Sequence, residues 1–581
     1  MEYTLFRVLS EGKEGAGVLH EYELLKPVIN EYAPEELKEK IRGLGVIRAT
    51  VHTPPYTMHK FWARRPWRVF RELIARFTRP GDIILDPFAG GGVTLVEGLI
   101  LRRKVIAVDL NPLAVKVMKH EVTPLDTRLF KEAVRRLSRI VEPVALEMYR
   151  VRCPKCGGRA TAIWTEYDAS RETPITVSYE CGVCGSKGLK PPEPGDLPEP
   201  PGLPPFTRVE IPPGDKTSDL LKRDIRFFDQ LFTKRNLYMV LILKQEIERL
   251  DTFGDDIKSF LLFTLSSTLK WASKMSHRRG DIIEGWALHA YWIYPRYLEV
   301  NVWRQFLNRA EAVLRGKEFT NKYIGFYARE AKTFNELASN ATYMILQLDS
   351  RKLPLPNESV DAVITDPPYG DNVNYAELSD YFLWLFRETA PKEEIVINRT
   401  RNFTIYHYQQ GLEEAFRECY RVLKPSRLLI STFNSKDAIV VGVFIYSLRR
   451  AGFNFVVASP QPYLKAYETT FHALQVDALP YDYVFFFYKG DIGSQPKSTT
   501  IENLHRFLTE ELEICKQVMC SEREYRMRVY PKLIELFVQA STISEITLAS
   551  RILEDTISKN SEYFKMVRRK RIEDRRSKRC C

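Results

Sequence analysis

Residues 81–109 read GDIILDPFAGGGVTLVEGLILRRKVIAVD and carry the pattern of an α/β fold. The apolar run Ile83–Leu85 predicts a strand, Thr94–Leu101 a helix, and Val105–Val108 a second short strand. Short apolar strands joined through a helix are typical of a parallel sheet that is buried on both faces. We therefore predict an α/β fold whose parallel sheet is built around this segment.

The turn between the first strand and the helix is rich in glycine and carries an acid. It reads Asp86-Pro87-Phe88-Ala89-Gly90-Gly91-Gly92, and such glycines let a ligand approach the backbone closely. The turn lacks the Gly-Lys-Ser/Thr ending of a P-loop, and Asp86 would repel a phosphate. Asp109 ends the second strand, where a carboxylate accepts hydrogen bonds from a ribose diol. The pattern favours a cationic nucleoside such as S-adenosylmethionine; the alternative is a plain turn followed by an exposed acid.

A second motif, Asp366-Pro367-Pro368-Tyr369, follows the predicted strand Val360–Thr365. Open α/β sheets bind ligands at the carboxyl ends of their strands, and the two prolines stiffen this loop. Asp366 and a prolyl carbonyl suit the two N–H groups of an exocyclic amine, and Tyr369 suits stacking on a planar base. A base in a duplex would have to flip out to reach them. The alternative is a strand-ending turn, because Asp-Pro-Pro is also good turn chemistry.

Four of the nine cysteines have the spacing of a metal site. Two residues separate Cys153 from Cys156 and Cys181 from Cys184, and 24 residues lie between the pairs. Four thiolates suit a closed tetrahedral zinc site that stabilises a small ribbon and leaves no position for catalysis. We expect ribbon strands at residues 162–164 and 176–179; the alternative is four free thiols.

The composition of the 581 residues excludes several classes of protein. Apolar residues make up 44% of the chain, which is too many for a disordered protein. No apolar run reaches the ~18 residues of a transmembrane helix, and the N-terminus does not resemble a secretion signal. We therefore expect a cytoplasmic protein without a membrane partner.

The net charge of +12 favours an anionic partner. Residues 565–579 hold nine Lys and Arg against two acids, so this basic tail accounts for most of the excess. Two further segments, Lys60–Arg79 and Lys270–Arg279, mix basic and aromatic residues, as nucleic-acid-binding surfaces do. The alternative for both segments is a solvated basic face, and a further alternative for Arg65-Pro66 is contact with the cofactor.

The pattern along the chain predicts one α/β domain that a long insertion interrupts. The predicted parts are 1–45 (N-terminal segment), 46–150 (first part of the domain), 151–190 (zinc ribbon), 191–215 (Pro-rich linker), 216–345 (mainly helical, possible target recognition), 346–492 (second part of the domain), 493–564 (helical) and 565–581 (basic tail).

Together these motifs resemble those of S-adenosylmethionine-dependent amino-methyltransferases of DNA, and especially the adenine-specific DNA methylases that contain a Zn-ribbon. Four further segments resemble that family: His59–Trp67, Glu299–Trp303, Tyr375–Tyr381 and Glu418–Pro425. The resemblance covers roughly residues 50–490. Val93 departs from the Gly-Thr-Thr that commonly continues the glycine loop, and Ser426-Arg427 replaces the usual Gly-Gly.

The resemblance implies a Rossmann-like methyltransferase sheet and methyl transfer to the exocyclic amine of adenine in DNA. It implies catalytic roles for Asp366, Pro367, Pro368 and Tyr369, and cofactor contacts by Asp86, Pro87, Phe88, Gly90, Gly92, Thr94, Asp109, Asn111 and Asp349. We expect Asp349 just before the strand that leads to Asp366; its alternative is a solvated loop acid. An RNA guanine or adenine amino-methyltransferase, a DNA cytosine amino-methyltransferase and an inactive zinc-ribbon nucleic-acid-binding protein stay open, as does a restriction or defence-system partner.

Overall fold

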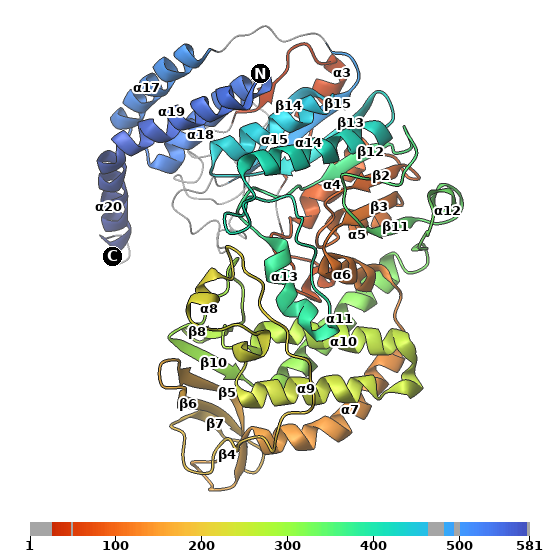
Figure 1. Ribbon diagram of the computed structural model, residues 1–581, viewed down its shortest axis with the longest axis vertical. Helices are drawn as coiled ribbons and strands as arrows, with labels where there is room; N and C mark the ends of the chain where they lie inside the picture. The colour runs from red at the N-terminus through yellow and green to blue at the C-terminus, as the bar shows by residue number, and fades with distance from the viewer. Residues whose placement is uncertain (1–25, 48–49, 463–480, 493–499, 578–581) are drawn as a thin grey trace.

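The computed structural model describes residues 26–47, 50–462, 481–492 and 500–577 (Figure 1). Its main sheet has eight strands in the order β1-β14-β15-β13-β12-β2-β3-β11. Their bounds are β1 (Val28–Ile29), β2 (Ile83–Asp86), β3 (Lys104–Asp109), β11 (Tyr343–Gln347), β12 (Ala362–Thr365), β13 (Arg427–Phe433), β14 (Asn454–Pro462) and β15 (Tyr481–Lys489). From β13 to β11 the strands run parallel, whereas β15, β14 and β1 are each antiparallel to their neighbours. The predicted α/β fold is confirmed.

Helices cover both faces of this sheet (Figure 1). One face packs against α3 (Glu35–Arg42), α4 (Trp67–Phe77), α5 (Val93–Ile100) and α6 (Pro112–Val122), and the other against α14 (Ile405–Val422) and α15 (Ala438–Arg450). Side chains alternate between the faces, so Ile84 joins the first core and Leu85 the second. Both layers of helices therefore hold the carboxyl ends of the parallel strands in place.

Four further helices form an outer layer at the C-terminal end of the chain. They are α17 (Ile501–Gln517), α18 (Glu522–Gln539), α19 (Ile543–Lys559) and α20 (Ser561–Ser577), and α18 and α19 pack on α15. The expected tail at 565–581 is helical through Ser577, and in α20 Val567 is buried while Arg571 donates a 2.8 Å hydrogen bond to Glu524. Phe564 and Val567 are buried, so this helix is anchored by its apolar residues.

The insertion between α6 and β11 forms a second core. Its helices are α7 (Thr127–Met148), α8 (Ser218–Lys222), α9 (Lys234–Glu248), α10 (Gly254–Ala272) and α11 (Val302–Tyr323), with 3-10 turns η2 (Phe228–Leu231) and η3 (Asp251–Phe253). Helix α7 falls within the predicted first part of the α/β domain (46–150), but it packs against α9 and α11. Its apolar stripe at Phe130, Leu137 and Val141 is buried in the core of the insertion.

The cysteine-containing ribbon is part of a five-stranded antiparallel sheet. Its strands are β4 (Arg150–Arg152), β5 (Arg159–Asp168), β6 (Thr173–Cys181), β7 (Lys187–Lys190) and β10 (Arg296–Val300). The strands expected at 162–164 and 176–179 lie inside β5 and β6. β10 lies in the region expected to be mainly helical, and it pairs with β5 across the long gap in sequence. The hairpin of β8 (His277–Arg279) and β9 (Ile282–Glu284) lies in the same region.

The Pro-rich segment 191–215 contains no helix and includes turns at residues 194–197. It is not a free linker, because Leu197 and Ile211 are buried in the second core. The remaining elements are η1 (Pro54–Thr57), α12 (Phe334–Ser339), α13 (Tyr375–Leu383) and η4 (Trp384–Phe386). Among the described residues, no helix is long and apolar enough to cross a bilayer.

Candidate active site

The glycine turn lies at the carboxyl end of β2, beside the carboxyl end of β12. Gly90 and Gly92 have φ angles of 47° and 76°, which residues with a side chain rarely adopt. A Cβ atom on Gly91 would come within 2.6 Å of Arg64 Nε. The turn thus requires glycine both for its backbone conformation and for the close approach of the segment before α4.

Asp109 ends β3 and is tied to the glycine turn. Its Oδ2 accepts a 2.8 Å hydrogen bond from Gly90 N, and its Oδ1 accepts one of 2.8 Å from Asn111 N. Asn111 in turn caps α6, because its Oδ1 accepts a hydrogen bond from Leu113 N at 2.9 Å. Burial of Asp109 raises its pKa to about 6. The carboxylate expected to meet a ribose is therefore pre-positioned by backbone N–H groups.

Asp86 is buried and links the two central strands. Its Oδ1 accepts hydrogen bonds from Thr365 Oγ1 at 2.7 Å and from Phe88 N at 3.2 Å. Burial raises the pKa of Asp86 to about 7, although the hydrogen bonds from Thr94, Thr365 and Phe88 oppose that shift. Thr365 ends β12, so this contact aligns the glycine turn with the loop that begins at Asp366.

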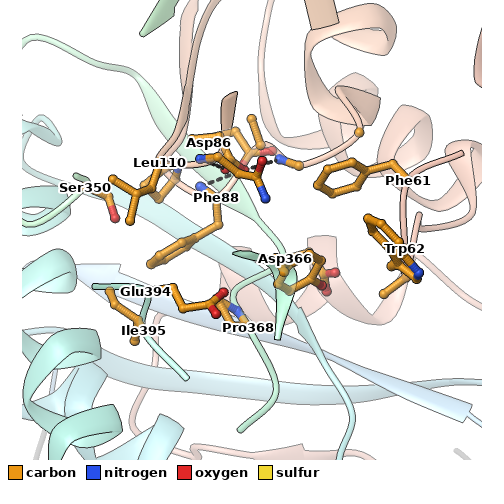
Figure 2. Close-up of a pocket in the computed structure, with 18 of the residues that line it drawn as sticks. Phe61, Trp62, Asp86, Phe88, Leu110, Ser350, Asp366, Pro368, Glu394 and Ile395 are labelled. Carbon is orange, nitrogen blue, oxygen red and sulfur yellow. Dashed lines mark hydrogen bonds between the residues drawn. The ribbon is translucent and has the colours of Figure 1, made fainter. Parts of the chain in front are cut away.

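One cavity, partly open to solvent, connects the two predicted motifs (Figure 2). The predicted site residues that line it are Asp86, Pro87, Phe88, Gly90, Thr94, Asp109, Asn111, Asp349, Asp366 and Pro368. Gly92, Pro367 and Tyr369 do not line it. Figure 2 shows Phe88 and Asp86 on one side of the cavity and Asp366 with Pro368 on another. The structure thus brings together segments that are almost 280 residues apart in sequence.

The carboxylate of Asp366 is held by three side chains. Its Oδ1 accepts hydrogen bonds from Thr432 Oγ1 at 2.5 Å and from the hydroxyl of Tyr369, and its Oδ2 accepts one from Arg65 Nε at 2.7 Å. Burial raises its pKa, although the nearby guanidinium of Arg65 favours the charged form. Tyr408 donates a 2.5 Å hydrogen bond to the carbonyl of Pro368 and so stiffens the loop.

The ring of Tyr369 is not presented to the cavity as a stacking surface. It packs edge-on against Phe433, with the ring centroids 4.6 Å apart, and the guanidinium of Arg65 lies 4.5 Å from its centroid in a cation–π contact. The side chain is buried. In this arrangement the guanidinium of Arg65 lies over the ring face of Tyr369 that was expected to stack on a base.

Asp349 follows β11 at the edge of the parallel strands. Its carboxylate forms an ion pair with Arg351 at 2.5 Å, and a third of its side chain is exposed. We expected it just ahead of β12, whereas it comes directly after β11, whose partner β3 carries Asp109. Asp349 and Asp109 consequently open into the same cavity from neighbouring strand ends.

Three residues that shape the site lie outside the predicted set. Arg64 is buried beside the glycine turn, with Nη1 3.0 Å from Glu121 Oε1. Burial raises the pKa of Glu394 to about 8, and its Oε2 accepts a hydrogen bond from Ala376 N at 3.1 Å. Arg64 was visible as part of a basic segment, but no signal in the sequence marked Glu121 or Glu394.

The first part of the basic segment Lys60–Arg79 forms an internal wall of the site, whereas Arg76 and Arg79 near its end are exposed. Phe61, Trp62, Arg64 and Arg65 line the cavity, and Arg71 forms an ion pair with the buried Glu97 at 2.5 Å. These residues face the cavity, and binding of nucleic acid by the segment stays a prediction. In the second basic segment, Arg279 is exposed at the tip of the β8–β9 hairpin, whereas burial lowers the pKa of Lys270 to about 8.

The four cysteines of the ribbon converge. All four sulfur atoms lie within 4.8 Å of one another, and Cys153–Cys184 and Cys156–Cys181 are each 3.7 Å apart. Tetrahedral zinc with Zn–S bonds of ~2.3 Å would place its sulfurs ~3.8 Å apart, so the arrangement fits such an ion. Gly157 and Gly185 follow the two pairs with φ angles of 69° and 71°, which allows the matching tight turns. The ribbon lies in the insertion, at the opposite end of the molecule from α17 and α19 (Figure 1).

Two family models match the chain on either side of the ribbon. The model described as DNA methylase matches residues 29–120, which include β2, the glycine turn and Asp109. The model described as the RMKL-like methyltransferase domain matches residues 291–426, which include Asp349 and Asp366-Pro367-Pro368-Tyr369. Together the two ranges contain every predicted cofactor-binding and catalytic residue.

Three Type II methyltransferases are similar to the chain. M.MjaII from Methanocaldococcus jannaschii is 20% identical over 419 residues, which cover 64% of this chain and 70% of the relative. M2.MboI from Moraxella bovis is 31% identical over 83 residues, covering 14% of this chain and 30% of the relative. M.MvaI from Kocuria varians is 23% identical over 305 residues, which cover 51% of this chain and 49% of the relative. The chain thus spans half or less of the length of the last two relatives.

A solved structure from Thermus thermophilus, a candidate DNA modification methylase, is 17% identical and covers 28% of this chain and 60% of that one. Its TM-score of 0.16 is too low to carry an argument. The family models and the Type II relatives agree with the motifs and confirm the resemblance that the sequence indicated. The chain contains a methyltransferase domain and resembles the DNA methylases.

Proposed function

We propose that this protein is an S-adenosylmethionine-dependent DNA methyltransferase that methylates the exocyclic amine of adenine. The observation that carries the proposal is the single cavity that Asp86, Asp109 and Asp349 share with Asp366 and Pro368. It lies at the carboxyl ends of neighbouring parallel strands, where open α/β sheets bind their ligands. The similarity to Type II methyltransferases supports DNA as the substrate.

The residues of the cavity suit the cofactor. Asp109 would accept hydrogen bonds from the ribose, Asp349 would face the adenine, and Phe88 would pack on the adenine ring. The acidic lining favours a cationic ligand over a phosphate, because burial raises the pKa of Asp109 only to about 6 and, although burial opposes it, Arg351 lowers the pKa of Asp349, so both carry negative charge at neutral pH. When bound, S-adenosylmethionine supplies the methyl group carried on its sulfonium sulfur.

The chain's own contribution to transfer would be positioning. Asp366 and a prolyl carbonyl of the motif would accept the two N–H bonds of the amine and orient the nitrogen lone pair toward the methyl group. Thr432, Tyr369 and Tyr408 would fix that loop through the hydrogen bonds already given. The target base would have to leave the duplex to enter the cavity.

The identity of the base is part of the proposal. The Asp at the head of Asp366-Pro367-Pro368-Tyr369 resembles adenine enzymes more than cytosine enzymes, so adenine is the first choice and cytosine the second. Methylation of RNA, at guanine or adenine, is the further alternative, and an inactive nucleic-acid-binding protein is the outcome in which nothing is methylated. A cytoplasmic location and a restriction or defence-system partner remain predictions.

We also propose that Cys153, Cys156, Cys181 and Cys184 bind one structural Zn²⁺. The four convergent sulfurs and the two glycine turns support this ligand set. A closed set of four thiolates leaves no position for substrate, so the ion would stabilise the ribbon and take no part in methyl transfer.

The first experiment incubates the protein with methyl-labelled S-adenosylmethionine and separate pools of DNA and RNA, followed by identification of the modified base. Label on N6 of adenine in DNA is the expected result. Label only in RNA, or on cytosine, would replace the substrate assignment, and label in neither pool would refute the enzyme assignment.

The Asp366→Ala variant tests the assigned role of the motif. It should abolish methyl transfer while binding of S-adenosylmethionine, measured by calorimetry, stays within a few-fold of wild type, because Asp366 would hold the amine and not the cofactor. The matched control is Asp371→Ala, an exposed acid of the same loop, which should retain activity. Retained transfer by Asp366→Ala would disprove the role.

A further inference from the structure

The amine-binding atom of the proposed site is already occupied by a side chain of the protein. Arg65 donates a 2.7 Å hydrogen bond from Nε to Asp366 Oδ2, and its guanidinium lies 4.5 Å from the ring centroid of Tyr369. These are the two contacts that we expected from a target base: a donor on the acid and a planar group on the ring. Arg65 also lines the cavity, so it stands in the path of a ligand and not behind it.

The carboxylate of Asp366 has little capacity left for a substrate amine. A carboxylate offers about four lone-pair positions, and Thr432, Tyr369 and Arg65 use three of them. Thr432 and Tyr369 both bond to Oδ1, whereas Arg65 bonds to Oδ2. The position on Oδ2 is thus the one that a substrate would have to share or take over.

A second carboxylate, that of Asp482, can keep an ion pair with the guanidinium of Arg65 when the bond to Asp366 is broken. Arg65 Nη1 lies 3.1 Å from Asp482 Oδ2, at the beginning of β15, and Asp482 is buried. A buried charge without a partner is costly, so complete removal of Arg65 from both acids would be unfavourable. A swing that keeps the pair with Asp482 and gives up only the bond to Asp366 avoids that cost.

The backbone before Arg65 holds a strained residue. Ala63 has a φ angle of 52°, a left-handed conformation that is unfavourable for a residue with a Cβ atom. It lies between the buried Trp62 and Arg64, whereas Pro66 caps the start of α4 directly after Arg65. The strain is therefore confined to the short connection that delivers Arg65 to the site.

We propose that Arg65 is a placeholder for the target base: its guanidinium occupies the amine position on Asp366, and the base takes that position only when Arg65 withdraws toward Asp482. The proposal rests on the proposed function, because it names what the amine must displace. It makes Arg65 a positioning residue, whose positive charge pairs with Asp366 and Asp482 until a base enters the cavity.

Binding of the free base adenine tests the placeholder. Equilibrium dialysis would compare wild type, Arg65→Ala, Arg65→Lys and the control Arg76→Ala, with and without saturating S-adenosylhomocysteine to fill the cofactor's own adenine position. Arg76 is a partly exposed arginine of α4 that bonds to the carbonyl of Gly43. Arg65→Lys keeps a positive charge near the acids, which preserves folding if the alanine variant is unstable.

The expected result is that Arg65→Ala binds adenine about tenfold more tightly than wild type, with Arg65→Lys between them and Arg76→Ala unchanged. Guanidinium ion at about 10 mM, far below denaturing concentrations, should compete with adenine in Arg65→Ala and have no effect on wild type. Equal binding by all four proteins, or no detectable binding by Arg65→Ala and Arg65→Lys, would overturn the proposal.

The readouts separate this inference from the proposed function. Absence of labelled methyl transfer by wild type would refute the enzyme assignment, whereas the adenine comparison between the variants would still be measured. Conversely, active wild type with equal adenine binding in every variant would leave the enzyme assignment intact and remove the placeholder. If free guanidinium raises the methylation rate of Arg65→Ala, then Arg65 orients Asp366 for transfer and the proposal is wrong.

Discussion

Carboxylates at strand ends, one buried and two half-buried, are the main chemical feature of the site at the scale of single residues. Asp86, Asp109 and Asp366 follow or end three different strands, and burial raises the pKa of each. Each is held by backbone or hydroxyl donors, which limits the cost of burying it. The site thus holds polar groups in fixed positions, as catalysis by orientation requires.

Asp86 should make the stability of the protein depend on pH. Its folded pKa of about 7 lies above the ordinary value of 3.8, so between about pH 4 and pH 7 the folded state keeps a proton that the unfolded chain has lost. The free energy of unfolding should therefore fall as the pH rises through that window, by at most about 1.4 kcal/mol per unit from this group. Asp86→Asn, which carries no charge, should flatten the slope in urea unfolding. Identical slopes for both proteins would contradict this assignment.

Most of the acids could be predicted from the sequence, but their environment could not. Asp86, Asp109 and Asp366 were visible because each stands at a motif beside a short apolar strand. Glu121 and Glu394 were invisible, since each lies in a helix or loop without a motif and reaches the site only through packing. The occupation of Asp366 by Arg65 was equally invisible, because the two residues are 301 positions apart.

At the scale of elements, the glycine turn is the connection that decides where α5 and the segment before α4 lie. Gly92 begins α5 with a φ of 76°, and a Cβ atom there would come within 2.8 Å of Glu121 Oε2 and 3.0 Å of Met118 Cγ, both on α6. Glycine is therefore required at this position for two reasons: the positive φ angle and the close approach of α6. Neighbouring helices leave no volume for a side chain.

Gly92→Ala and Gly81→Ala separate these two effects. Gly81 also has a positive φ, of 90°, but a Cβ atom there would meet nothing within 4 Å. We expect Gly81→Ala to lower the free energy of unfolding by roughly 1–2 kcal/mol, the cost of the conformation alone. Gly92→Ala should cost roughly 1–3 kcal/mol more, because α6 must shift as well. Urea unfolding would measure both, and equal losses would show that the close approach does not matter.

At the scale of the whole molecule, the insertion forms part of the wall of the site. Trp62 Nε1 donates a 3.3 Å hydrogen bond to the carbonyl of Leu288, and Lys317 Nζ donates one of 2.9 Å to the carbonyl of Glu121. The ribbon reaches this wall through β10, which pairs with β5 and leads into α11. The second core is thus connected to the glycine turn and not merely attached to the sheet by a linker.

Removal of zinc should loosen the ribbon before the main sheet. Chelation, or Cys156→Ser, should abolish protection from hydrogen exchange in β4–β7 and weaken it in β10, because the ion would supply the folding free energy of that unit. Protection in β2, β3 and β12 should stay within a few-fold of wild type, since their cores are separate. Zn²⁺ should restore the ribbon and Mg²⁺ should not, because thiolates favour the softer ion. Unchanged exchange in β4–β7 after removal of metal would refute the zinc site.

The sequence by itself determined the local features of this protein: the short apolar strands, the glycine turn, the Asp-Pro-Pro-Tyr loop and the two cysteine pairs. Each depends on neighbouring residues, through strand periodicity, the conformations that glycine and proline allow, or ligand spacing. Only the tertiary structure decided that α7 and β10 join the insertion, that Phe61–Arg65 line the cavity, and that Arg65 lies on Asp366. Those outcomes come from packing and charge pairing between segments far apart in the chain, and no local pattern encodes which distant surface a residue will meet.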